Sequence, residues 1–115
     1  MNTKSKPPEE LAKDLSKRSI CNVRVAAVVF DSYGICGWGW NSSGKDGMGC
    51  HAEAHAIGRT KRSRLVGATI AVYGERNKNT TVMSFPCDAC RKKIVNSGIS
   101  KVMFSTKEGW KEVKL

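Results

Sequence analysis

Runs of hydrophobic residues alternate with polar stretches along the chain, and their periods predict which segments form helices and strands. Residues 8–18 place Leu11 and Leu15 four positions apart, with proline at the start, acids early and bases late, as in a short amphipathic helix. Residues 23–31 are mostly β-branched and apolar, which predicts a strand buried on both faces. Residues 35–41 follow a Ser-Tyr-Gly turn and are expected to pair with that strand in a hairpin.

The remainder of the chain continues this alternation. Pro86 is expected to open a helix at its first position, where the missing N–H is harmless, and Gly98 to end that helix. The turn at 106–109 is too short for a parallel connection, so the last two strands should be antiparallel. The expected segments are a helix at 50–60, a strand at 67–73, a polar excursion at 74–79, an extended segment at 80–85, a helix at 86–98, and strands at 101–105 and 110–115.

Length and hydrophobicity fit one domain. The chain has 115 residues, of which 40% are hydrophobic, so we expect a single core and a single domain over residues 1–115, with 1–8 as a flexible lead. Residues 42–49 are glycine-rich and polar, and are expected to form a loop at the rim of a pocket. No apolar run is long enough to span a membrane, and residues 1–10 lack a signal-peptide hydrophobic region. The sequence therefore predicts a cytoplasmic protein with no membrane partner.

Basic residues outnumber acidic ones by two to one. Twenty Lys and Arg against ten Asp and Glu give a net charge of +10, which favours an anionic partner; solvated surface charge is the alternative. Two clusters, at residues 61–64 and 91–93, would suit phosphate contacts if the fold brought them to the mouth of a pocket.

The cysteines and histidines suggest a metal site. Five cysteines are an odd number, and Cys87 and Cys90 have metal-ligand spacing, so a secreted disulfide framework is not indicated. His51 adds an imidazole, and Glu53 follows two residues later. Zinc takes thiolate and imidazole ligands in a tetrahedron, and a catalytic site keeps its fourth position open to water.

The order His-x-Glu, followed 36 residues later (87 minus 51) by Pro-Cys-x-x-Cys, resembles the signature of the cytidine/deoxycytidylate deaminase superfamily. The resemblance implies a three-layer α/β/α fold with a mixed sheet of about five strands and a C-terminal antiparallel hairpin. It implies one zinc ion per chain held by His51, Cys87 and Cys90, with Glu53 as the catalytic proton carrier. Free-nucleoside cytidine deaminases have Cys-Ala-Glu where this chain has His-Ala-Glu, so Cys50 is expected to be a neighbour rather than a ligand.

The resemblance also implies substrate contacts. Backbone groups near Ala52 and near Ser84 and Phe85 are expected to hydrogen-bond the base edge, although Phe85 would serve equally in the core. Asn41 is expected to contact the sugar; a turn-forming residue at a strand end is the alternative. His55 is either a substrate contact or a buried structural histidine. Trp40, with Trp38 two positions earlier on the same strand face, would stack on a base or pack in a core or dimer.

These residues predict zinc-dependent hydrolytic deamination of cytosine in a nucleoside or nucleotide. A first alternative is a deaminase of cytosine, or less favoured adenine, in single-stranded DNA or RNA. A second is a nucleic-acid-binding module with a structural zinc, closed by His55 as fourth ligand. Riboflavin-pathway deaminases share a His-Ala-Glu-x-His stretch, but their cysteines lie further apart. Family members often form homo-oligomers, and no stripe in the sequence identifies such an interface.

Overall fold

The computed structural model describes residues 6–42, 51–77 and 80–115. The predictions for Cys50, for most of the 42–49 loop and for residues 1–5 lie outside these ranges. Within the described ranges the elements are α1 (Pro8–Ser16), β1 (Val23–Asp31), β2 (Gly34–Trp40), α2 (Ala52–Arg59), α3 (Arg62–Leu65), β3 (Thr69–Arg76), β4 (Thr80–Val82), α4 (Asp88–Ser97), β5 (Lys101–Thr106) and β6 (Gly109–Lys114).

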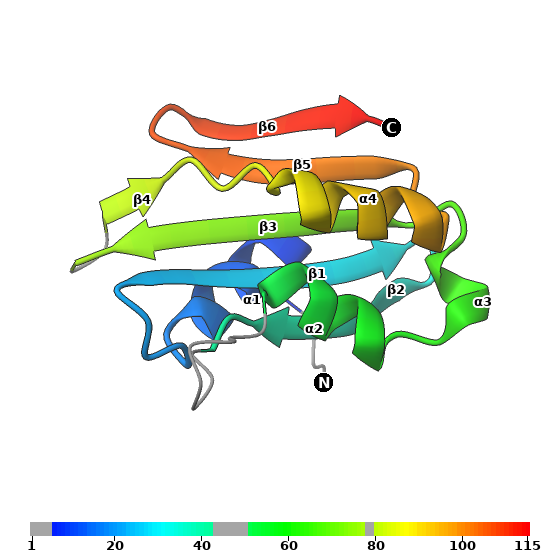
Figure 1. The fold of residues 1–115 in the computed structure, drawn as a ribbon, viewed down its shortest axis with the longest axis horizontal. Helices are drawn as coiled ribbons and strands as arrows, with labels where there is room; N and C mark the ends of the chain where they lie inside the picture. The colour runs from blue at the N-terminus through cyan, green and yellow to red at the C-terminus, as the bar shows by residue number, and fades with distance from the viewer. Residues whose placement is uncertain (1–5, 43–50, 78–79) are drawn as a thin grey trace.

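The strands form one mixed sheet in the order β2-β1-β3-β5-β6, with β4 paired to the carboxyl end of β3 (Figure 1). β3 and β5 are parallel, and the other neighbours are antiparallel, including the C-terminal hairpin of β5 and β6. The predicted fold class is therefore confirmed. The short strand β4 raises the strand number among the described residues from the expected five to six.

Helices cover both faces of this sheet. α2 and α4 lie on one face and α1 on the other, as the ribbon shows (Figure 1). The core beneath α2 and α4 contains Ala27, Val29, Ala52, Ala56, Leu65, Ala68, Ile70, Val72, Ile94, Ile99, Val102 and Phe104. The smaller core beneath α1 contains Ala12, Leu15, Ala26, Val28 and Tyr73.

Two glycines let α2 lie directly against β2. A Cβ at Gly39 would come within 2.6 Å of the Ala56 backbone nitrogen and 2.7 Å of the His55 Cβ. A Cβ at Gly37 would come within 1.7 Å of the Thr60 hydroxyl oxygen. Because side chains alternate along a strand, Trp38 and Trp40, which each follow one of these glycines, start from the opposite face of the sheet.

Several predicted boundaries were wrong for identifiable reasons. The third strand runs on to Arg76 rather than yielding to a polar excursion at 74–79, because Glu75 is buried against cationic partners. The second core helix begins at Asp88, not at Pro86, because Cys87 has the extended conformation of an N-cap. His51 has the same role before α2. The helical turn α3 was not predicted; it falls on one of the basic clusters.

Candidate functional site

His51, Cys87 and Cys90 are brought together by the starts of two helices. His51 is the N-cap of α2, Cys87 is the N-cap of α4, and Cys90 is the third residue of α4. The first N–H groups of a helix lack intrahelical partners and carry partial positive charge, so both helix ends favour anionic groups such as thiolates beside them.

The three ligand atoms fit one zinc ion. His51 Nδ1 lies 3.1 Å from Cys90 Sγ and 3.8 Å from Cys87 Sγ, and all three ligand atoms lie within 4.8 Å of one another. Ligand atoms bound tetrahedrally to one zinc lie roughly 3.5–3.8 Å apart, given bond lengths of about 2.0–2.3 Å. Among the described residues this cluster comprises three side chains, His51, Cys87 and Cys90.

Burial makes this cluster dependent on a cation. The pKa of the Cys90 thiol is raised to about 12, mainly by burial and secondly by the negative charge of the nearby Glu53 carboxylate. A thiolate at that position therefore requires a positive charge beside it, which a bound metal ion supplies. The chemistry of the donor set thus agrees with its geometry.

Glu53 lies beside the cluster without belonging to it. Its side chain is in the first turn of α2, is 6% exposed and contacts the Cys90 thiol. Burial raises the pKa of the Glu53 carboxyl above its usual range, although its own backbone N–H, His51 and Cys90 oppose the shift. A carboxyl whose pKa is raised in this way holds a proton more readily than an exposed carboxyl does.

A cavity of about 300 Å³ opens onto the cluster and onto Glu53. This volume is at the small end of the range for ligand pockets. The structure brings four predicted substrate contacts, Asn41, Ala52, Ser84 and Phe85, into this lining. The complete lining is Val23, Val25, Asn41, His51, Ala52, Glu53, Met83, Ser84, Phe85 and Cys87.

Sequence reasoning missed three of the lining residues. Val23 and Val25 lie at the start of β1, and Met83 follows β4. The alternation of Val23 and Val25 at the start of a predicted strand was an available signal, because both side chains point to one face. Met83 carried no comparable signal, since it lies in an irregular segment.

His55 and Trp40 lie outside this lining and contact each other instead. His55 Nδ1 is 3.2 Å from the Trp40 nitrogen and 3.1 Å from the Trp40 carbonyl oxygen, and the two rings meet edge to face at 5.2 Å. His51 precedes the helix in an extended conformation, so the four-residue spacing does not bring His55 to the same side. Within the described chain, His55 is also no member of the metal cluster.

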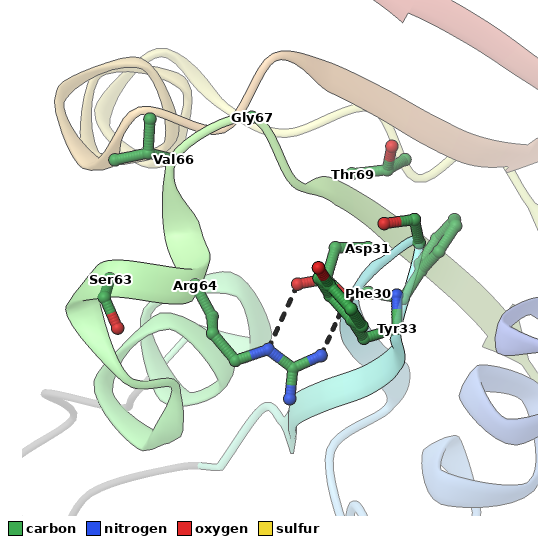
Figure 2. A pocket seen from close by; sticks show the side chains of 9 residues that line it. Phe30, Asp31, Tyr33, Ser63, Arg64, Val66, Gly67 and Thr69 are labelled. Carbon is green, nitrogen blue, oxygen red and sulfur yellow. Dashed lines mark hydrogen bonds and ion pairs between the residues drawn. The ribbon is translucent and has the colours of Figure 1, made fainter.

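Two larger openings lie away from the cluster. One of about 860 Å³ is at the opposite end of β1, where Arg64 of α3 donates two hydrogen bonds to Asp31 (Figure 2). That guanidinium holds the pKa of Asp31 below its usual range, and the pair neutralises itself. The other, of about 910 Å³, lies between α2, α3 and α4 and brings Arg62 and Lys93 of the two basic clusters to one groove. In the described part of the chain neither opening contains a His/Cys cluster.

The helices of the described residues include none that is both long and apolar enough to cross a membrane.

Solved structures with the same fold include deaminases. The chain superposes on a cytidine deaminase from Burkholderia pseudomallei with a TM-score of 0.73 and 23% identity, covering 93% of this chain and 89% of that one. A dCMP deaminase from the cyanophage S-TIM5 gives a TM-score of 0.65 and 23% identity, covering 83% of this chain and 76% of that one. A cytidine deaminase from Mycobacterium leprae gives a TM-score of 0.60 and 21% identity, covering 90% of this chain and 88% of that one. At these identities the likeness establishes the fold.

The family is established by sequence. No curated protein matches the chain. The family model described as "Cytidine and deoxycytidylate deaminase zinc-binding region" matches residues 4–106, which is most of the chain and includes His51, Glu53, Cys87 and Cys90. The chain therefore belongs to the cytidine and deoxycytidylate deaminase family and is a zinc-dependent hydrolytic deaminase.

Proposed function

We propose that the protein deaminates cytosine in a nucleoside or nucleotide. The observation that carries the proposal is the cavity of about 300 Å³ in which the buried Glu53 lies next to His51, Cys87 and Cys90. Cytosine and one water would yield uracil and ammonia, as the bond from C4 to the exocyclic nitrogen breaks and a C4–O bond forms. The relatives named above are deaminases of cytidine and dCMP, which supports this choice of base.

His51, Cys87 and Cys90 would hold the zinc, and Glu53 would move the protons. A bound zinc ion supplies a Lewis acid that lowers the pKa of water from about 16 to about 7. Glu53 would carry one proton from the attacking water to the ring nitrogen N3, where it stays in uracil, and then a second proton from the new C4 hydroxyl to the leaving amine.

The base edge would meet backbone groups at two places. α2 begins at Ala52, which lines the cavity, so the Ala52 N–H has no i−4 carbonyl partner within the helix and would be available to the base. The Ser84 hydroxyl donates to the Val72 carbonyl at 2.6 Å, and the Ser84 N–H donates to the Ser105 carbonyl at 3.0 Å. The Ser84 carbonyl is therefore the group that would accept a hydrogen bond from the amine of cytosine. Phe85 would cover one face of the ring.

Asn41 would contact the sugar through one N–H. Its Oδ1 accepts from the Val25 N–H at 2.9 Å and from the Ser19 hydroxyl at 2.6 Å, and its Nδ2 donates to the Val23 carbonyl at 2.9 Å. An asparagine amide has two N–H donors and one carbonyl oxygen, so the second N–H is the group left for a ligand. The three hydrogen bonds fix the orientation of the Asn41 amide.

The test is ammonia release from zinc-loaded protein offered deoxycytidine, deoxycytidylate, a cytosine oligonucleotide and adenosine-containing RNA. Turnover of the first two supports the proposal, and turnover of adenosine alone would overturn the choice of base. Glu53→Gln should lower turnover by about 10²–10⁴-fold with zinc content unchanged, because proton transfer is lost. Glu108→Gln, at an exposed turn position, should leave turnover unchanged. Full activity in Glu53→Gln would overturn its role.

The structural-zinc alternative makes the opposite prediction. Zinc-loaded protein would release no ammonia from any of these substrates, and its fourth coordination position would be filled by protein. The cytoplasmic location and a homo-oligomeric state stay predictions, to be measured by fractionation and by sedimentation.

A further inference from the structure

A second surface outside the cavity combines aromatic rings with unneutralised positive charge. It consists of Arg18, Trp38, Trp40 and Arg59, and we call it the tryptophan–arginine edge. The Arg59 guanidinium lies 5.3 Å from the Trp40 ring and 6.0 Å from the Trp38 ring, and Arg18 lies 5.3 Å from Trp40. The Trp38 side chain is 41% exposed and therefore accessible to a ligand.

The position of this surface follows from the fold. β2 is the outermost strand on its side of the sheet, and Gly37 and Gly39 face α2. Trp38 and Trp40 therefore start from the face opposite to α2. Arg59, which belongs to α2, reaches around the open strand to lie near both rings.

The charges on this surface are not compensated by acids. Arg24 and Arg64 each bond a carboxylate, on Glu75 and Asp31 respectively. Across the described ranges neither Arg18 nor Arg59 forms an ion pair with an acid. In a protein of net charge +10, two such guanidiniums on aromatic rings attract an anion that also has flat faces.

The edge adjoins the cavity along the sequence of β2. Trp40 directly precedes Asn41, which lines the cavity, and Trp38 lies roughly 7 Å further along β2, given about 3.3 Å per strand residue. A single nucleoside with its base at Glu53 would occupy the cavity and leave the outer tryptophan uncovered. Nucleotides that flank the target in a longer strand would reach it.

We propose that the tryptophan–arginine edge binds single-stranded nucleic acid, with a flanking base stacked on Trp38 and phosphates beside Arg59 and Arg18. Stacking platforms next to cationic side chains are the common means of holding such strands without sequence preference. The delivery of a cytosine from that strand to the cavity rests on the proposed function. The binding itself does not.

Binding is therefore measured with strands that cannot react. Labelled oligothymidylate and oligouridylate, which contain no cytosine, are titrated with zinc-loaded protein while anisotropy and tryptophan fluorescence are followed at several salt concentrations. We expect binding of at least one oligonucleotide with quenching of tryptophan fluorescence, and the two titrations show whether DNA or RNA is preferred. Absence of binding at low salt would overturn the proposal even if deoxycytidine is deaminated.

Variants locate the binding. Trp38→Ala should weaken binding about tenfold, because the stacking of one base is lost, and Trp38→Phe should restore most of the loss. Arg59→Gln should weaken binding and reduce the salt slope by about one. Lys111→Gln removes the same charge from the exposed strand β6 at the other side of the sheet, and should leave binding unchanged.

Two outcomes would contradict this placement. An equal loss in Arg59→Gln and Lys111→Gln would mean that binding follows total charge alone. Normal oligonucleotide binding by Trp38→Ala, together with a change from dimer to monomer in sedimentation, would mean that the edge joins two copies of the chain. Zinc content and circular dichroism of each variant show that it is folded.

Discussion

At the scale of single residues, the glycines of β2 have the most direct link to the site, because α2 carries both His51 at its cap and Glu53 in its first turn. Gly39→Ala should destabilise the protein by about 1–3 kcal/mol, since the new methyl group meets backbone and Cβ atoms at 2.6–2.7 Å. It should also lower turnover, because α2 must move. The measurements are urea denaturation and ammonia release.

Gly58 provides the matched control for that substitution. It lies on the exposed side of α2, and an added Cβ would have nothing within 4 Å, so Gly58→Ala should be stabilising by about 0.5–1 kcal/mol. Comparable destabilisation by both substitutions would contradict the close approach of α2 to β2.

Glu75 makes stability depend on pH. Burial raises the pKa of this carboxyl, but hydrogen bonds and charge from Lys17 and Arg24 outweigh burial and hold the pKa below its usual range. The unfolded chain therefore takes up the proton first as pH falls. The stabilisation is present above about pH 4.5 and is lost as pH falls toward the folded-state pKa.

Glu75→Gln should remove this pH-dependent contribution. We expect it to destabilise by about 1–3 kcal/mol at pH 7, because the hydrogen bonds to a charged acceptor are lost. Below pH 4 the difference in the free energy of unfolding between the variant and the unmodified protein should become smaller. Urea denaturation at pH 7 and pH 3.5 measures both effects, and a constant difference at the two pH values would refute the assignment. Glu108→Gln should change neither value.

At the scale of elements, zinc would join the start of α2 to the start of α4. Removal of zinc by a chelator should therefore lower the unfolding temperature by several degrees, since a ligand bound only to the folded state stabilises it. Cys90→Ser should abolish the response to chelator, whereas Cys21→Ser, outside the cluster, should retain it. An equal response in both variants would contradict the assigned ligands.

Apart from the short α3, the order and type of these elements could be predicted from the sequence, because their causes are local. The apolar run of β1, the amphipathic spacing of Leu11 and Leu15, and Gly98 with its left-handed backbone all act within a few residues. The end of β3 could not be predicted in this way. Glu75 is tolerated in a buried strand only because Lys17 and Arg24, distant in sequence, lie beside it.

At the scale of the whole molecule, some features of the site follow from local sequence motifs and others depend on contacts between distant segments. The clustering of His51, Cys87 and Cys90 was predictable because these residues belong to two short motifs, and the fold brings them together as expected. The catalytic role of Glu53 stays a prediction. The contact between His55 and Trp40 was not predictable, because it depends on how closely α2 approaches the open strand β2. The tryptophan–arginine edge likewise requires side chains from three separate segments of the chain.

The separation of the metal ligands along the chain bears on how the protein folds. His51 and Cys87 are 36 residues apart, and they meet only after β3 has paired with β1 and both α2 and α4 have docked on the sheet. The assembly of such non-local contacts is slow compared with forming a single helix or hairpin. High-affinity zinc capture is therefore a late event in refolding, and its rate reports the final docking of the two helices rather than the first collapse of the chain.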